Sequence, residues 1–217
     1  MPLHANASPP IRPRHAASVM LVRPDASGAL TVLMGRRSRR AAFVPDVFVF
    51  PGGRVDTADA ITETVTPLAP AEASRLAAAG AAGPRLARAL ATAAIRETWE
   101  ETGYILGASR VDNDRILADQ AALRFSARAI TPRESPIRFH ARFFLADGSA
   151  LQGPPTGSGE LTDLAWYPLA EAQALPVIDV TEFMLANLAA LAETPQRLPL
   201  FVYRHGRPAI RWLTAPA

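Results

Sequence analysis

Three glutamates near the middle of the chain have the types and spacing that could do chemistry. Glu97, Glu100 and Glu101 stand at i, i+3 and i+4, which places their carboxylates on one face of an α-helix. Like charges at this spacing repel, the negative end of the helix dipole adds to the repulsion, and Arg96 alone leaves the group negative. A divalent cation would balance it, since carboxylates often hold Mg²⁺ together with phosphate oxygens. A solvent-facing acidic helix end that binds nothing is the alternative.

The helix that must carry these glutamates has clear start and stop signals. Pro84 suits a first helical position, and Gly103 supplies the left-handed residue that often ends a helix. The sequence therefore predicts a helix over 84–102. Its apolar stripe through Leu86, Leu90 and Ala93 continues into the three glutamates, so an inward-facing side of the helix ends in negative charge.

Two glycines that end a strand come before this helix in the sequence. The β-branched and aromatic residues 47–50 predict a strand, and Pro51-Gly52-Gly53 then stops it in a tight loop. Residues 57–83 between loop and helix are rich in alanine, with prolines and glycines as punctuation. We expect a short helix at 71–79 within them.

The remaining elements alternate irregularly, which favours a mixed sheet flanked by helices over a doubly wound parallel one. We expect strands at 18–22, 30–34, 104–106, 138–145 and 161–167, helices at 116–128 and 180–192, a loop at 152–159, and a closing hairpin turning at 204–207. Residues 1–15 are expected to form an extended or disordered arm. Residues 16–217 then form a single domain.

Composition narrows the classes of function. The 217 residues include no cysteine, which excludes disulfides and thiolate metal sites and fits a cytoplasmic location. The formal net charge is +3, too small for a nucleic-acid footprint. We therefore do not expect nucleic acid as a partner. No apolar run approaches the length of a membrane span, so we do not expect a membrane as a partner either.

Two segments together resemble the Nudix hydrolase signature, G-x5-E-x7-R-E-U-x-E-E-x-G-U, in which U is apolar. The segment 96–104, R-E-T-W-E-E-T-G-Y, matches its second half except that Thr98 stands at an apolar position. The segment 50–56, F-P-G-G-R-V-D, supplies Gly53 as the first glycine. Asp59 stands where the signature has glutamate, and Asp56 is an alternative for that acid. Residues 60–95 replace x7, so an insertion at about 60–83 lies inside the motif.

The resemblance implies an α/β/α sandwich with a mixed sheet and a loop–helix–loop catalytic motif. It implies that the three glutamates coordinate Mg²⁺, or Mn²⁺, with the carbonyl of Gly53, and that Arg96 holds the glutamates in position. The activity it implies is metal-dependent hydrolysis of a diphosphate linkage in a small phosphorylated substrate. Family members are often dimers, so a homodimer is one expectation for this chain.

The general base and the substrate contacts stay open at this point. The family's base lies either in the signature or on a later loop, where Glu160 is the best distal candidate and Glu134 the second. Guanidinium groups suit phosphates, which makes Arg36, Arg37 and Arg138 candidates for substrate binding.

The P-G-G-R-V-D turn followed by the insertion resembles the branch of the family that includes coenzyme A diphosphatases. This resemblance narrows the choice of substrate. The segment 33–38, L-M-G-R-R-S, is similar to that branch, but Ala42 and Asp46 replace the arginine and glycine of its motif. Coenzyme A or an acyl-CoA leads, with ADP-ribose and NADH as alternatives. A non-catalytic Nudix-like regulator would be expected to have lost signature carboxylates, and a helical interaction protein would not predict the P-G-G turn.

Overall fold

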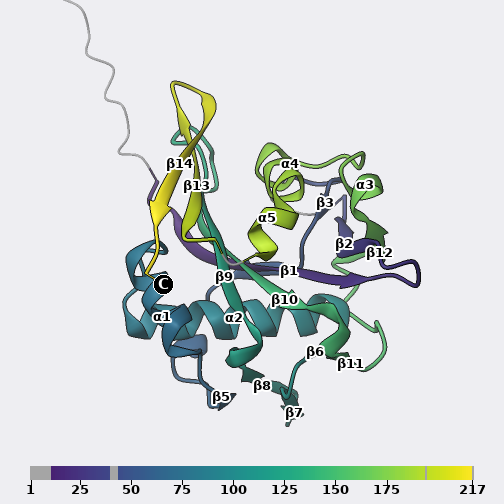
Figure 1. Ribbon diagram of the computed structural model, residues 1–217. Helices are drawn as coiled ribbons and strands as arrows, with labels where there is room; N and C mark the ends of the chain where they lie inside the picture. Colours follow the sequence, from purple (N-terminus) through teal and green to yellow (C-terminus); the bar gives the residue numbers. More distant parts are fainter. Residues whose placement is uncertain (1–10, 40–43, 194, 217) are drawn as a thin grey trace, which may run out of the picture.

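A nine-stranded mixed sheet with helices on both faces forms the centre of the computed structural model, which describes residues 11–39, 44–193 and 195–216. Helices α1 and α2 lie on one face of the sheet and α3, α4 and α5 on the other (Figure 1). The helices are α1 (Pro70–Ala78), α2 (Pro84–Thr102), α3 (Leu169–Ala172), α4 (Asp179–Ala186) and α5 (Leu188–Ala192). This is the expected α/β/α sandwich.

The strands are β1 (Arg14–Pro24), β2 (Leu30–Arg37), β3 (Phe48–Val49), β4 (Gly52–Arg54), β5 (Thr64–Thr66), β6 (Ile105–Leu106), β7 (Arg110–Asp112), β8 (Arg115–Asp119), β9 (Arg124–Ile130), β10 (Phe139–Asp147), β11 (Leu151–Gln152), β12 (Leu161–Pro168), β13 (Arg197–Arg204) and β14 (Arg207–Thr214). The large sheet has the order β12-β2-β1-β10-β9-β13-β14, with β3 paired to β2 and β4 to β1. The pairs β1–β10 and β9–β13 are parallel, and the others are antiparallel.

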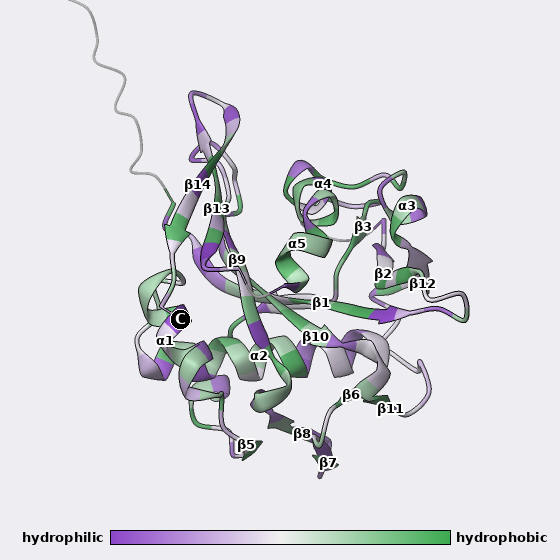
Figure 2. Ribbon diagram, viewed as in Figure 1, coloured by the Kyte–Doolittle hydropathy of each residue, from purple (hydrophilic) through white to green (hydrophobic). Residues whose placement is uncertain are grey.

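Strand β1 shows how the sheet separates two cores. Its residues Ala17, Val19 and Leu21 pack into the cluster that includes α1 and α2. Met20 faces the other way, into the cluster with α4 and α5. This alternation follows from the two-residue period of a strand. Figure 2 shows the hydrophobic colouring of β1 and the hydrophilic tip of the β13–β14 hairpin.

Helix α2 has the predicted bounds. Pro84 is in its first turn, Leu90 and Ile95 are buried, and Gly103 closes it in the left-handed conformation with φ 77°. Thr98, at the apolar position of the signature, is fully buried, and its hydroxyl donates to the carbonyl of Ala94 at 2.8 Å. The internal hydrogen bond lets a threonine take the place of an apolar residue.

The prediction of a helix at 116–128 is wrong. These residues form β8, a short 3-10 turn and most of β9. The central part of β9 is buried on both faces, so Phe125, Ser126 and Ala127 are all inaccessible. A run buried on both sides lacks the alternation that marks a strand, and periodicity alone does not separate it from a buried helix.

Other predicted bounds need smaller corrections. The strand expected at 47–50 covers only Phe48–Val49. The helix expected at 180–192 is divided at Asn187 into α4 and α5. Strand β1 begins at Arg14, so the last residues of the expected arm join the sheet, while residues 1–10 lie outside the described residues. Among the helices of the described residues, none is both long and apolar enough to cross a membrane.

The inserted segment is attached to several other elements of the domain. Its strand β5 pairs with β8 in a small separate sheet, and α1 packs against α2. After α1, the carbonyls of Gly80 and Ala81 accept hydrogen bonds from the fully buried Arg142 of β10 at 2.9 and 3.3 Å. Oriented carbonyls near a helix C-terminus are favourable neighbours for a buried cation. The insertion is therefore fixed to the sheet.

The loop after β11 packs against the end of α2. The N–H of Ser158 donates to the carbonyl of Glu100 at 2.8 Å. A Cβ on Gly103 would lie 2.5 Å from the backbone nitrogen of Thr156, and one on Gly157 would lie 1.9 Å from the carbonyl oxygen of Glu101. This close packing brings the segment before β12 beside the last turn of α2.

We expect Gly103→Ala to destabilise the protein by more than the about 1–2 kcal/mol that a left-handed backbone costs an L-residue. The excess arises because the new methyl group would collide with the backbone of the loop at Thr156. The matched control is Gly28→Ala, where φ is 85° and no atom lies within 4 Å of the added Cβ. Urea unfolding measures both, and equal losses in the two variants would contradict the packing.

Candidate active site

The last turn of α2 lies against the two glycines of β4. The N–H of Gly52 donates to Oε2 of Glu101 at 2.8 Å. A Cβ on Gly53 would lie 2.4 Å from Oε2 of Glu97, so only glycine leaves room for that carboxylate. The glycines and the glutamates, distant in sequence, are therefore in direct contact.

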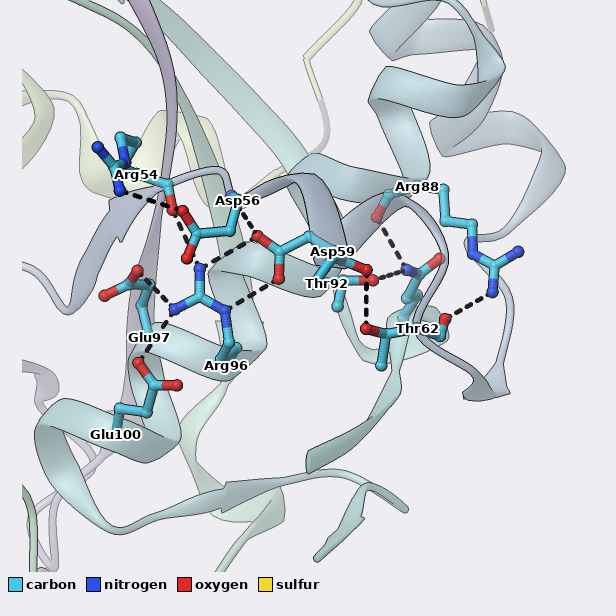
Figure 3. Close-up of polar contacts among 11 residues, drawn as sticks. Arg54, Asp56, Asp59, Thr62, Arg88, Thr92, Arg96, Glu97 and Glu100 are labelled. Carbon is cyan, nitrogen blue, oxygen red and sulfur yellow. Dashed lines mark hydrogen bonds and ion pairs between the residues drawn. The ribbon is translucent and has the colours of Figure 1, made fainter. Parts of the chain in front are cut away.

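Arg96 is the centre of the polar network on this turn (Figure 3). Its Nη1 donates to Glu97 at 2.8 Å and to Glu100 at 3.0 Å. Its Nη2 donates to the carbonyl of Arg54 in β4 at 3.0 Å. Burial alone would lower the pKa of Arg96, but its bonds with Asp59 and Glu97 raise that pKa above the ordinary value. Arg96 therefore stays charged and joins α2 to the glycine loop.

Asp59, which comes directly before the insertion in the sequence, completes the network. Its carboxylate accepts from Arg96 Nε at 2.9 Å and from Nη2 at 3.1 Å, and its side chain is only 2% exposed. It also accepts from the N–H of Asp56 at 2.7 Å. The Asp56 carboxylate instead pairs with Arg54 at 3.3 Å. Of the two aspartates that sequence left open, Asp59 is the one bonded to Arg96.

The surroundings of Glu97 and Glu101 disfavour the ionised forms of their carboxylates. The pKa of Glu101 is raised to about 8, chiefly by burial and further by the charges of Glu97 and Glu160. The hydrogen bond from Gly52 and the charge of Arg37 oppose this rise. Burial also raises the pKa of Glu97, against the attraction of Arg96. A cation placed among these groups would reverse both shifts, since it favours the ionised form.

The donors suit a hard divalent cation. Within the described ranges, no three Asp, Glu or His side chains converge on a single metal position as they stand. The bonds to Arg96 take Oε1 of Glu97 and Oε2 of Glu100, one oxygen from each carboxylate. Carboxylate oxygens and the neighbouring carbonyl of Gly53 are the ligand types that Mg²⁺ and Mn²⁺ prefer.

Glu160 lies near the same turn, on an exposed position directly before β12. The packing of the preceding loop against α2 brings it there, and its charge acts on Glu101. Glu134, the second distal candidate, is exposed between β9 and β10. The geometry thus brings Glu160 to the signature glutamates.

The three candidate arginines have different surroundings. Arg37 is close enough to Glu101 for their charges to interact, and burial lowers its pKa. Arg36 pairs with Asp46 at 3.5 Å and Asp163 at 3.8 Å. Arg138 donates to two backbone carbonyls, those of residues 11 and 131, at 2.7 and 3.3 Å. Arg37 alone of the three is beside the glutamates.

A cavity of about 680 Å³ adjoins the site and was not predicted from the sequence. Gly52, Gly53 and Arg37 line it, together with residues of β1, β9, β10, β13 and α4. Its far wall includes Asp179 and Tyr203, which no motif connects. The sequence offered one sign of the cavity, the small residues Ala16, Ala129 and Ala141 in three strands. They can be recognised as neighbours only when the pairing of the strands is known.

Comparison with known proteins finds one family to which the chain is similar. A family model described as the NUDIX domain matches residues 84–186, beginning where α2 begins. The crystal structure of a NUDIX hydrolase from Alicyclobacillus acidocaldarius is 27% identical, with a TM-score of 0.65 over 82% of this chain and 92% of that chain. A MutT protein from Bacillus halodurans shares the fold at 16% identity, with a TM-score of 0.53 over 92% and 97% of the two chains. No curated protein matches the sequence.

We expect the metal-free protein to lose stability as pH rises from about 5 to about 8. The folded pKa of Glu101, about 8, exceeds the about 4.3 of an unfolded glutamate. The folded state therefore binds more protons in this window, and the stabilisation present below the unfolded pKa disappears as pH passes the folded one. Melting temperatures in EDTA should fall less steeply with pH for Glu101→Gln than for the wild type.

Glu134→Gln is the control for this measurement, because it removes a carboxylate at an exposed position between β9 and β10, away from the site. It should keep the wild-type slope. Parallel pH profiles for the wild type and Glu101→Gln would show that Glu101 titrates normally.

Proposed function

We propose that the chain is a Nudix-type hydrolase, an enzyme that acts on phosphorus-containing acid anhydrides, and that it cleaves the diphosphate linkage of a nucleoside diphosphate derivative with Mg²⁺ or Mn²⁺. One observation carries the proposal. The carboxylates of Glu97 and Glu101 lie against Gly53 and Gly52, and Arg96 bonds to Glu97, to Glu100 on the same helix turn and to the glycine strand.

Roles follow from these contacts. We assign Glu97, Glu100 and Glu101, with the carbonyl of Gly53, to metal binding. Arg96 has the role of fixing two of these carboxylates, because it bonds to both. Arg37, half-buried and with its charge acting on Glu101, is the arginine that we assign to the substrate phosphates. Arg36 and Arg138 have weaker support, since their contacts are with Asp46, with Asp163 and with backbone carbonyls away from the glutamates.

The reaction needs a nucleophile and a proton acceptor. A bound divalent ion supplies charge neutralisation of the phosphates and a water of lowered pKa. The water oxygen forms a bond to one phosphorus, and the bridging P–O bond breaks with its electrons going to the leaving phosphate. A carboxylate takes the proton of the water. Glu101, whose burial raises its pKa to about 8, and the nearby Glu160 are the two candidates for this base.

Coenzyme A or an acyl-CoA remains the leading specific substrate, with ADP-ribose and NADH as alternatives. The motif of the coenzyme A branch would fall at Ala42 and Asp46. Ala42 lies outside the described residues, and Asp46 pairs with Arg36. A non-catalytic regulator is less well supported, because such a protein would be expected to have lost signature carboxylates, and this chain keeps Glu97, Glu100 and Glu101.

Glu101→Gln should lower kcat by about a hundredfold or more, as expected when a metal ligand or general base is removed. Formation of the two phosphomonoester products from coenzyme A, ADP-ribose and NADH, each with Mg²⁺ and separated by chromatography, measures it. Glu160→Gln should show a similar loss only if Glu160 is the base. The exposed Glu134→Gln is the control with wild-type rates. Failure of the wild type to hydrolyse all three substrates would favour the regulator.

Asp59→Asn should lower kcat about 10–100-fold, the range seen when a residue that orients metal ligands is changed. The amide keeps the shape of the side chain but loses the charge that faces Arg96 at 2.9 Å. The exposed Asp56→Asn is the matched control and should change kcat less than about twofold, since its carboxylate pairs with Arg54 instead. Equal losses in the two variants would remove Asp59 from the network.

A further inference from the structure

The cavity beside the glycines is built as a groove across five strands. Its floor is one row of paired residues, running from Arg54 in β4 through Ala16, Ala141 and Ala129 to Phe201 in β13. Four strand spacings make this row about 19 Å long. The three alanines keep it open, because larger side chains there would fill the space between the sheet and α4.

Four aromatic rings line the groove, one of them that of Phe201 at the end of the floor. Phe50 and Phe143 stand nearly perpendicular, with ring centres 6.4 Å apart. Phe201 and Tyr203 do the same at 5.6 Å. All four line the cavity. Ring walls of this kind suit a flat aromatic group, which can stack on one ring and contact the edge of another.

The two ends of the groove differ in charge. At the β4 end lie the glycines, Arg54 and, from β2, Arg37, which interacts with Glu101. Arg14 of β1, the strand paired with β4, is the third basic residue in the lining. At the β13 end, Asp179 begins α4 and is the one acid among the described residues that line the cavity. The basic end beside the glutamates suits the diphosphate. The acidic end must therefore face the other part of the substrate.

Asp179 and Tyr203 form a bonded pair at that end. The Tyr203 hydroxyl donates to Oδ2 of Asp179, while Oδ1 accepts from the N–H of Val180 at 2.8 Å. A carboxylate only accepts hydrogen bonds, and a phenol whose proton is committed presents oxygen lone pairs. The pair thus offers two neighbouring acceptors, which match the two N–H donors of an amino group.

We propose that this groove binds the base of the substrate and that Asp179 and Tyr203 select a base with an exocyclic amino group. An acyl chain would fit the apolar walls equally well, but it would remove the Asp179 carboxylate from water without offering a donor, which costs free energy. The inference rests on the proposed function in taking the substrate to be a nucleoside diphosphate derivative.

Calorimetric binding of two nucleoside monophosphates in EDTA tests the proposal without hydrolysis. Adenosine 5′-monophosphate carries the amino group, and purine riboside 5′-monophosphate has hydrogen in its place. The wild type should bind the first about tenfold more tightly or better, the range for a hydrogen bond to a charged group. This ratio should fall to within about threefold in Asp179→Asn and decrease in Tyr203→Phe. The exposed Asp112→Asn is the control and should keep it.

Three results would overturn the proposal. The wild type could bind both monophosphates equally, or bind neither, and in each case the groove does not select an aminated base. Alternatively, n-octyl phosphate could bind more tightly than adenosine 5′-monophosphate and displace it, which would make the groove a site for an alkyl chain. Selective binding in EDTA without hydrolysis of any diphosphate in Mg²⁺ would support this inference and overturn the proposed function.

Discussion

The attachment of Arg96 is the interaction on which the site depends. One guanidinium contacts a buried aspartate from the near end of the insertion, two glutamates of its own helix and the backbone of β4. Its planar fork of donors can satisfy several acceptors at once, which an ammonium group could not do in the same geometry. The guanidinium therefore sets both the separation of helix and glycine strand and the direction of the carboxylates. Without it, three acids on one turn would repel each other into solvent.

The carboxylates of α2 and the groove beside α4 lie on opposite faces of the sheet and meet at the glycines of β4. Carboxylates from α2 gather at the glycines, where charge is concentrated and partly buried. The aromatic groove runs from there across the sheet to a single acid at the start of α4. In the proposed function, the chemistry at the first end concerns only the diphosphate and would be common to many substrates. The choice among substrates would then depend on the second end, which the signature does not include.

Sequence predicted those parts of the structure whose causes are local. Pro84 and Gly103 fixed the ends of α2, and the spacing of the glutamates fixed their common face. Within residues 116–128, the part that forms β9 was assigned wrongly because a strand buried on both faces has no period of its own. Asp59 was uncertain because its partner lies beyond the insertion. Asp179 and Tyr203 could not be paired at all, since their contact depends on how β13 and α4 meet on the same side of the sheet.

The insertion also affects how the chain folds. Contact between Gly53 and Glu97 closes a longer loop than an uninterrupted motif would, but each doubling of a loop adds only about 0.6 kcal/mol of closure entropy. Asp59 at one end and the carbonyls after α1 at the other are fixed in place. Both contacts are made with residues far along the chain, so they shorten the effective loop only once α2 and β10 have come together. Changes in the length of its exposed middle should then affect folding speed more than the final arrangement of the site.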